Sequence, residues 1–376
     1  MEYIKLCEVI SSAKIERCGA SDYPVLSITK SDGVVLQSDK FKKRIASRDT
    51  EQYKLVKRGQ LVQGIHIDEA NFGIQSIVDI GIVSPAYKIW NVDFQKIVPK
   101  YLETVLRSPR SVRYYSSKFN GSVKRRERIT DSDFLAMEIP FPSKEQQQYA
   151  VDVLEKVCSM TTLYQQQLQK LDELVKARFV EMFSSCQHIA SMNELCSIIT
   201  DGTHQPPKFQ DNGIPFIFVS NLVNNTVTYN AEKFISEETY GELYKRTPIE
   251  IGDLLLSTVG SYGHVAVVVE DKKFLFQRHI AYLKPKHEIV NSFYLYAALL
   301  SPDGQRQIEE KVKGIAQKTL NLSEIKTILI PLPSIEEQKN FEVFIKQVDK
   351  SKVAVQKALD EAQLLFDSLM QTYFDE

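Results

Sequence analysis

The sequence predicts an α+β protein in which two mixed α/β domains are separated by two long antiparallel coiled-coil helices, with a pseudo-two-fold internal repeat. Three observations support this class. A Pro-x-Pro segment occurs twice, 191 residues apart, as Ile139-Pro-Phe-Pro-Ser143 and Ile330-Pro-Leu-Pro-Ser334. A long amphipathic stretch without Pro or Gly follows each copy, and a β-rich region precedes each copy. A duplication of this length predicts two similar modules with approximate internal symmetry.

Each Pro-x-Pro segment predicts an extended entry into a helix, because proline fixes φ and disfavours helical backbone at the residue before it. Ser143 and Ser334 then occupy the N-cap positions. Gln146 and Glu337 follow three residues later, where they complete capping boxes. The start of both long helices is therefore well specified.

Apolar residues within the two stretches recur at alternating spacings of three and four, which is the seam of a coiled coil. A helix of roughly 35 to 40 residues spans on the order of 50 to 60 Å, too long for burial in one mixed domain. We expect the helices to pack antiparallel on each other, and the alternative is that each one mediates homo-oligomerisation. The predicted helix-pairing residues are Leu154, Val157, Tyr164, Leu168, Leu171 and Val175 in the first helix, and Ile345, Val348, Val355, Leu359 and Phe366 in the second.

The remaining sequence divides into two β-rich regions with alternating or β-branched strand patterns. Their sequences match poorly, whereas the flanking elements match well. A scaffold that is repeated and a surface that differs would suit recognition of two different targets. The predicted strands are 23–28, 34–36, 60–63 and 80–83 in the first region and 214–219, 253–257, 265–269 and 280–283 in the second, with short helices at 99–106 and 293–300. The predicted domains are 1–142, 143–184 (first long helix), 185–333 and 334–376 (second long helix).

Composition indicates a globular, soluble chain, with 43% hydrophobic and 25% charged residues. No run approaches the roughly 18 apolar residues of a spanning helix, and the start does not resemble a signal peptide, so we expect a cytoplasmic protein without membrane association. The five cysteines include no CxxC pair and are expected to be free thiols. A formal net charge of −1 means that any nucleic-acid binding must depend on local patches.

The common catalytic motifs are missing from the sequence, including the dinucleotide-binding, Walker, zinc-protease and nucleophile-elbow patterns. Pro206-Pro207 lacks the flanking residues of an adenine methyltransferase motif. Asp303, Glu309 and Glu310 superficially resemble a nuclease carboxylate set, but they fall on a predicted helix that places them badly for a metal. The histidines lack metal-ligand spacing. We therefore expect no catalytic residues, no metal site and no enzymatic activity in this chain.

Local basic clusters suit contacts to phosphates, and Arg and Gln can also contact base edges in the major groove. Any one cluster alone is more simply explained as a solvated loop, but similar clusters precede both Pro-x-Pro segments. A further candidate is Asp201-Gly-Thr-His204, because Asp-Gly favours a tight turn that presents the next two residues, although a purely structural turn is equally consistent. The candidate DNA-binding residues are Lys42, Lys43, Arg44, Lys124, Arg125, Arg126, Arg128, Thr203, His204, Arg278, Gln317 and Lys318.

Taken in order, several segments make the chain resemble the specificity subunits of type I restriction-modification systems over essentially its whole length. No single segment is diagnostic, but their order together with the duplicated Pro-x-Pro and helix unit is quite specific. The first domain lacks a counterpart of the Asp-Gly-Thr-His turn, so contact residues cannot be transferred between the halves. The segments are 53–59, 81–87, 201–207, 213–221, 252–257 and 314–333.

The resemblance implies two target recognition domains, each of which recognises one half of a split, asymmetric double-stranded DNA sequence, while the two helices set the spacer length. It implies no catalytic site and no cofactor in this chain. S-adenosylmethionine, ATP and Mg are expected on partner subunits, namely two modification subunits docked on the helices and restriction subunits in the full complex. The recognised sequence and spacer length are not encoded in any motif.

Two other classes stay open at this point. One is the recognition half of a fused methyltransferase-nuclease, which would need a further catalytic domain that no stretch supplies. The other is a coiled-coil scaffold that does not bind DNA.

Overall fold

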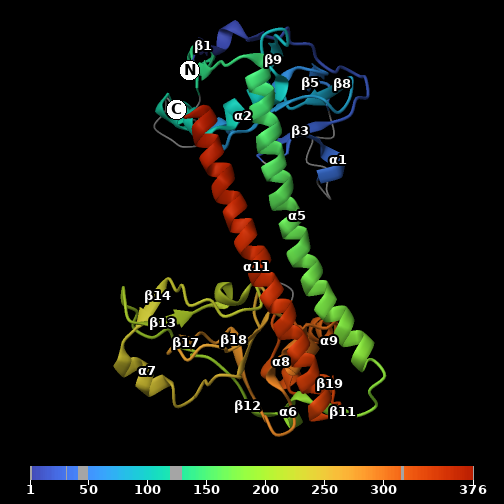
Figure 1. Cartoon of the computed structure of the whole chain (residues 1–376), viewed down its shortest axis with the longest axis vertical. Coiled ribbons are helices and arrows are strands. Elements are labelled where there is room, and N and C mark those ends of the chain that lie inside the picture. The colour runs from blue at the N-terminus through green and yellow to red at the C-terminus, as the bar shows by residue number, and fades with distance from the viewer. Residues whose placement is uncertain (1, 31, 41–49, 119–128, 315–316, 376) are drawn as a thin grey trace. The chain divides into compact units, whose positions relative to one another are not determined.

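The computed structural model divides the chain into two compact units, which we describe separately (Figure 1). Unit 1 comprises residues 1–164 and 358–376, and unit 2 comprises residues 165–357. The structure describes residues 2–30, 32–40, 50–118, 129–314 and 317–375. Each unit combines sheets with helices, as the α+β prediction required.

The largest sheet of unit 1 has the strand order β2-β9-β6-β7, and smaller antiparallel pairs are β3-β4, β5-β8 and β1-β10. Trp90 and Phe134 are buried in the core of this unit. The strands are β1 Tyr3–Lys5, β2 Ile10–Ser12, β3 Leu26–Thr29, β4 Gly33–Leu36, β5 Lys54–Lys57, β6 Leu61–Gln63, β7 Phe72–Ile74, β8 Ile80–Val83, β9 Lys88–Val92 and β10 Glu138–Pro140. The helices are α1 Gln37–Lys40, α2 Pro99–Arg107, α3 Pro109–Ser117 and α4 Asp131–Leu135, with 3-10 turns at Leu6–Glu8 and Ile67–Glu69.

Unit 2 repeats this plan, because its largest sheet has the order β12-β18-β15-β16, and β14-β13-β17 and β11-β19 complete the unit. The strands are β11 Ile189–Ser191, β12 Cys196–Asp201, β13 Ile214–Ile217, β14 Lys233–Ile235, β15 Leu254–Ser257, β16 Val265–Val267, β17 Leu275–Phe276, β18 Ile280–Pro285 and β19 Leu329–Pro331. The helices are α6 Met192–Leu195, α7 Glu237–Leu243, α8 Ser292–Leu300, α9 Pro302–Lys311 and α10 Leu322–Ile325, with a 3-10 turn at Val219–Leu222.

The predicted helix starts are confirmed in both copies. The N–H of Ser143 donates to Oε1 of Gln146 (3.1 Å), and the N–H of Gln146 donates to Oγ of Ser143 (3.3 Å). Ser334 and Glu337 make the same reciprocal pair at 2.9 and 3.3 Å. The helices that follow are α5 (Lys144–Phe183) and α11 (Ile335–Phe374), each of 40 residues.

Each unit contains one end of each long helix, and in both units the start of one helix shares a core with the end of the other. In unit 1, Leu154 near the start of α5 shares a core with Phe374 at the end of α11. In unit 2, Phe183 at the end of α5 shares a core with Phe341 near the start of α11. The helices are therefore antiparallel. Among the predicted pairing residues, Leu154, Val157, Val175, Ile345 and Val348 are buried, and Tyr164, Leu168, Leu171, Val355, Leu359 and Phe366 are half-buried.

A buried glutamine secures the start of each long helix. Gln147 is fully buried, accepts a hydrogen bond from the N–H of Val98 before α2 (2.9 Å) and donates to the carbonyl of Pro142 (2.9 Å). Gln338, at the equivalent position in unit 2, accepts from the N–H of Asn291 before α8 (2.8 Å) and donates to the carbonyl of Pro333 (3.0 Å). One side-chain amide thus joins the Pro-x-Pro segment to the shorter helices.

Substituting Gln147 with Ala should destabilise unit 1 by about 1–3 kcal/mol, because the half-buried N–H of Val98 loses its acceptor and the fully buried amide is removed. The single tryptophan of the chain, Trp90, is buried in the same core, so its fluorescence during urea unfolding reports on this unit. Gln148→Ala is the matched control, since this neighbour is exposed and should change stability by no more than about 0.5 kcal/mol. Equal shifts for the two variants would contradict a special role for Gln147.

Candidate nucleic-acid interface

Seven of the candidate DNA-binding residues lie outside the described residues, so the structure does not place them. They are Lys42, Lys43, Arg44, Lys124, Arg125, Arg126 and Arg128. The other five candidates all belong to unit 2. They are Thr203, His204, Arg278, Gln317 and Lys318.

The loop that follows β12 is hydrogen-bonded to the turn between β17 and β18. The N–H of Thr203 donates to the carbonyl of Phe276 (3.0 Å), and the N–H of Arg278 donates to the carbonyl of Thr203 (3.1 Å). On the other side of this turn, the N–H of Thr258 donates to the carbonyl of His279 (2.9 Å). Segments more than 50 residues apart in sequence are thereby placed next to one another.

The same pattern extends to the segment that carries Lys318. The N–H of Leu320 donates to the carbonyl of Thr258 (2.8 Å), and the N–H of Gly260 donates to the carbonyl of Lys318 (3.2 Å). Residues 201–205, 277–279, 258–260 and 318–320 therefore form one continuous structure, which we call the loop ribbon. The backbone of this ribbon carries four of the five described candidates, and Gln317 is directly adjacent in sequence.

Gly202 is required at its position because two segments approach closely there. A Cβ atom on Gly202 would lie 2.2 Å from the carbonyl oxygen of Phe276 and 2.6 Å from that of Gln277. Both distances are far below ordinary van der Waals contact. The Gly of the Asp-Gly-Thr-His segment thus permits the backbone of the loop to pair with the turn at Gln277.

Asp201 holds the side chains of His204 and Arg246 against this loop. Its Oδ2 lies 2.8 Å from Nε2 of His204, and its Oδ1 lies 2.6 Å from the guanidinium of Arg246. His204 is nevertheless 54% exposed, so the outward presentation expected from sequence agrees with its exposure. The same residues border an open cavity of about 340 Å³ lined by Gly202, Thr203, His204, Gln205, Leu243, Arg246 and Thr247.

Lys318 and His279 differ in how they contribute charge to the ribbon. The ammonium of Lys318 lies 5.6 Å from the ring centre of Tyr262 and 3.4 Å from its hydroxyl oxygen, within the range of a cation–π contact. Burial, with the neighbouring charge of Arg278, lowers the pKa of His279, so the imidazole is neutral near pH 7. The positive charge of the turn at residues 277–279 therefore resides on Arg278.

The strand that leads into the ribbon is anchored by a buried carboxyl group. Oδ2 of Asp253 lies 2.8 Å from the hydroxyl oxygen of Tyr282, which also lies 2.8 Å from the carbonyl of Pro248. Burial raises the pKa of Asp253, while Lys284 at 3.4 Å acts in the opposite direction. Oδ2 of Asp253 also accepts a hydrogen bond from the N–H of Glu250 (2.8 Å), so the buried carboxyl group joins Tyr282 to the backbone before β15.

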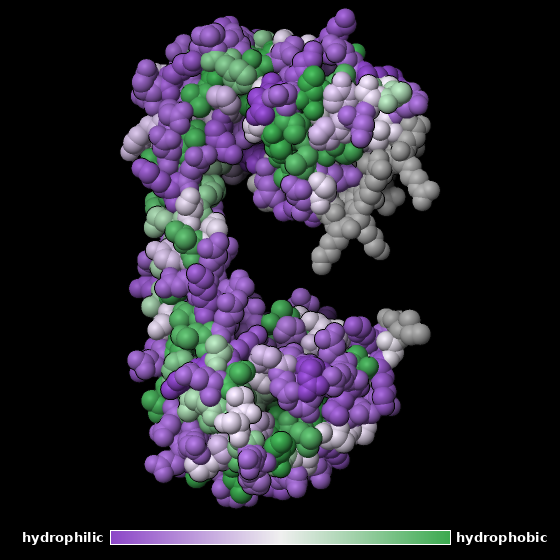
Figure 2. Space-filling view, turned by 90° about the vertical axis from the view of Figure 1, so that its right-hand side faces the viewer, coloured by the Kyte–Doolittle hydropathy of each residue, from purple (hydrophilic) through white to green (hydrophobic). Residues whose placement is uncertain are grey.

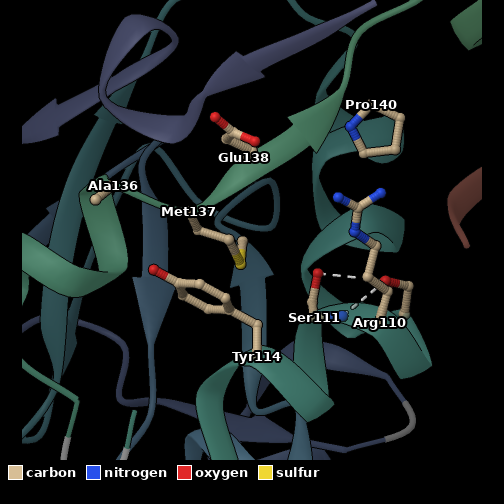
Figure 3. A pocket seen from close by; sticks show the side chains of 8 residues that line it. Arg110, Ser111, Tyr114, Ala136, Met137, Glu138 and Pro140 are labelled. Carbon is tan, nitrogen blue, oxygen red and sulfur yellow. Dashed lines mark hydrogen bonds between the residues drawn. The ribbon is translucent and has the colours of Figure 1, made fainter. Parts of the chain in front are cut away.

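Unit 1 shows where the repeated parts differ. In unit 2 the side-chain amide of Gln307 accepts from the N–H of Leu329 and donates to its carbonyl, both at 2.9 Å. At the equivalent place in unit 1, Tyr114 instead donates to the carbonyl of Asp133 (2.8 Å). A cavity of about 220 Å³ remains beside Glu138 (Figure 3). Arg110, Ser111 and Tyr114 line this cavity together with Glu138.

On the face drawn in Figure 2, hydrophilic residues predominate over each unit and apolar groups are interspersed among them. Within the described part of the chain, His, Cys, Asp and Glu side chains are not grouped so as to hold a metal ion. Among the helices of the described residues, none is both long and apolar enough to cross a bilayer. All five cysteines are free thiols, as predicted.

Sequence reasoning missed the partners that assemble the ribbon. Arg246 was not a candidate, because nothing in the sequence connects it with Asp201, 45 residues earlier. The Ser-Pro starts of α3 and α9, at Ser108-Pro109 and Ser301-Pro302, were also overlooked although they form a second repeated motif. The latter could have been found, since both serines cap their helices and the spacing to each Pro-x-Pro segment is nearly the same.

Comparison with known proteins gives consistent matches. The family model described as "Type I restriction modification DNA specificity domain" matches residues 189–362. The specificity subunit of the type I restriction enzyme EcoBI from Escherichia coli is 31% identical over 171 residues, 46% of this chain and 36% of that relative. The chain spans between 36% and 60% of the length of the curated relatives that it matches.

Two solved structures share the fold. A chain from a study of complex assembly and conformational transition of the type I restriction-modification system has a TM-score of 0.61 at 18% identity, covering 99% of this chain and 97% of that chain. The specificity subunit of a type I system from M. genitalium has a TM-score of 0.51 at 14% identity, covering 99% and 96%. At these identities the likeness concerns the fold alone.

The fold defines a class of proteins in which a repeated helical frame carries two mixed α/β domains with different surfaces. The family model and the curated relatives connect part of the chain with type I restriction-modification specificity subunits, since residues 189–362 match the model and one such subunit is 31% identical over 171 residues.

Gly202→Ala should destabilise unit 2 by about 1–3 kcal/mol, because the added methyl group collides with backbone atoms that cannot rotate away. Thermal unfolding measured by circular dichroism tests this, and hydrogen exchange should show the loss of protection in 196–206 and 275–283. Gly241→Ala in α7 is the control, since nothing lies within 4 Å of its added Cβ and the substitution should be neutral or stabilising by up to about 1 kcal/mol. Equal stability of the two variants would refute the packing argument.

Proposed function

We propose that this chain is a sequence-specific DNA-binding subunit that directs a type I restriction-modification complex to a bipartite, asymmetric target. The observation that carries this proposal is the loop ribbon of unit 2, which assembles Thr203, Arg278 and Lys318 from three separate loops. Its side chains can donate to phosphates and base edges, and its backbone is held by hydrogen bonds between loops. Residues 1–142 and 185–333 would be the two target recognition domains.

The differing surfaces of the two units support a split target. Both large sheets share one strand order, and the same glutamine secures both long helices. By contrast, unit 1 has no sequence counterpart of Asp201-Gly-Thr-His204. A shared frame with unlike surfaces suits two half-sites of different sequence, and it gives no reason to expect catalysis by this chain.

The outward faces of the long helices support docking of modification subunits, for which we propose two copies. Leu163 on α5 is 62% exposed, and Val353 and Leu364 on α11 are 71% and 70% exposed. These apolar side chains lie outside the predicted pairing seam. Burying them against a partner would remove apolar area from water, which favours association. Restriction subunits would join the complex through this assembly.

Co-expression of the chain with its modification partner tests the function directly. We expect adenine or cytosine methylation at one bipartite motif across the host genome, and salt-dependent, sequence-specific binding to a duplex that contains this motif. The partner alone and the chain alone should methylate no motif. A coiled-coil scaffold without DNA function would leave the genome unmethylated in all three cases, and methylation by the isolated chain would indicate a fused enzyme.

We further propose that α5 and α11 set the length of the unspecified spacer. Asp172 of α5 lies 2.6 Å from Lys352 of α11, so residues 165–171 face approximately residues 353–359. Four residues inserted into both of these segments would lengthen the pair by about 6 Å and preserve the facing of the helices. Methylation mapping should then show a spacer longer by one or two base pairs, because B-DNA rises roughly 34 Å per turn of about 10 base pairs.

Insertion into only one helix is the control for this experiment, since it breaks the matched seam and should reduce assembly rather than change the spacer. Full methylation by the double-insertion variant at an unchanged spacer would exclude the helices as the measuring element.

A further inference from the structure

The arginines of unit 2 differ in whether an acid neutralises them. Arg178 pairs with Glu181, Arg246 with Asp201, and Arg306 with both Asp303 and Glu310. Arg278 is the fourth arginine of the unit. Within the described residues its exposed side chain has no ion pair or hydrogen bond.

The backbone of Arg278 is nevertheless held in place. Its N–H donates to the carbonyl of Thr203, the N–H of Ile280 donates to the carbonyl of Gln277 (3.1 Å), and the carbonyl of His279 accepts from Thr258. The flanking residues Phe276 and Ile280 are buried in the core. This backbone fixes the point at which the Arg278 side chain leaves the turn, and the exposed guanidinium is free to reach a base edge outside the protein.

The ribbon also prevents internal neutralisation of Arg278. Asp201 is the one acidic residue in the four segments of the ribbon, and its two carboxylate oxygens already lie within bonding distance of His204 and Arg246. Because both carboxylate oxygens of Asp201 already have partners, Arg278 stays available to an external ligand. No carboxylate of the described residues pairs with Arg278, so all of its guanidinium N–H groups can donate to that ligand.

We propose that Arg278 is a specificity-determining residue that recognises a guanine through O6 and N7 in the major groove. This inference rests on the proposed DNA-binding function. Among base edges, the planar fork of arginine matches the two acceptors of guanine, whereas a lysine offers a single rotating ammonium. Lys318, stacked on Tyr262 at the far side of the ribbon, would contact phosphate and contribute affinity without base preference.

Methylome sequencing of a host that expresses the chain with its modification partner tests this assignment. The wild-type motif should contain a guanine that Arg278→Lys relaxes by about 10- to 100-fold relative to the other bases, while every other motif position stays fixed. Binding of Arg278→Lys to the wild-type duplex should fall, whereas binding to duplexes substituted at this position should change little. Arg278→Ala should relax the same position and weaken binding further.

Two variants serve as controls. Lys318→Ala should weaken binding to all duplexes alike and lower the salt dependence, with the motif unchanged. Arg306→Ala removes an exposed arginine outside the ribbon and should change neither binding nor motif. Thermal unfolding confirms that all variants are folded.

The outcomes separate the two levels of the proposal. If the wild-type chain with its partner methylates no motif, the proposed function itself fails. If the wild type methylates a motif and Arg278→Lys keeps it unrelaxed, Arg278 is a phosphate contact and the guanine assignment is overturned. Relaxation at a position that is not guanine overturns it as well.

Discussion

A buried glutamine amide at the start of each long helix is the interaction on which the rest of the molecule depends. Gln147 and Gln338 are each fully buried and bond backbone groups on both the Pro-x-Pro segment and the residue before α2 or α8. A buried amide side chain stabilises the fold only when its oxygen and its N–H groups are both hydrogen-bonded, which requires a defined geometry. The direction in which α5 and α11 leave their units is therefore defined locally, by groups within each unit.

The ends of the same helices close the two cores. Phe183 packs on Tyr294 with ring centres 5.1 Å apart, and Phe374 packs on Tyr101 at 5.5 Å. The hydroxyls of these tyrosines donate to the carbonyls of Pro331 and Pro140 of the repeated segments. Each unit consequently needs a helix end that is distant in sequence, and the last residues of the chain are part of the core of unit 1. Truncation at the C-terminus would open that core.

The candidate DNA-binding residues of unit 2 are placed by backbone hydrogen bonds between loops and not by the long helices. The loop ribbon depends on Gly202 for its closest approach and on Asp201 for its electrostatics. A single carboxylate neutralises Arg246 and partners His204, which leaves Arg278 as the exposed positive group of its turn. Gln307 and Tyr114 occupy equivalent positions in the two units, but Gln307 bonds the backbone of Leu329 and Tyr114 bonds the carbonyl of Asp133. The repeated parts therefore diverge locally where this side chain differs.

The sequence by itself determined the elements whose cause is local. The extended Pro-x-Pro entries, the capping boxes at Ser143 and Ser334 and the three-four seam of α5 and α11 depend on neighbours within one helical turn or on periodicity, so they were predictable. The common strand order of the two large sheets was not, because β2-β9-β6-β7 and β12-β18-β15-β16 arise from pairings between poorly matching sequences. The tertiary structure alone decided that the loops of Thr203, Arg278 and Lys318 are joined by backbone hydrogen bonds and that no acid among the described residues pairs with Arg278. The physical reason is that ion pairing and burial depend on which distant side chains meet, and local sequence carries no record of those contacts.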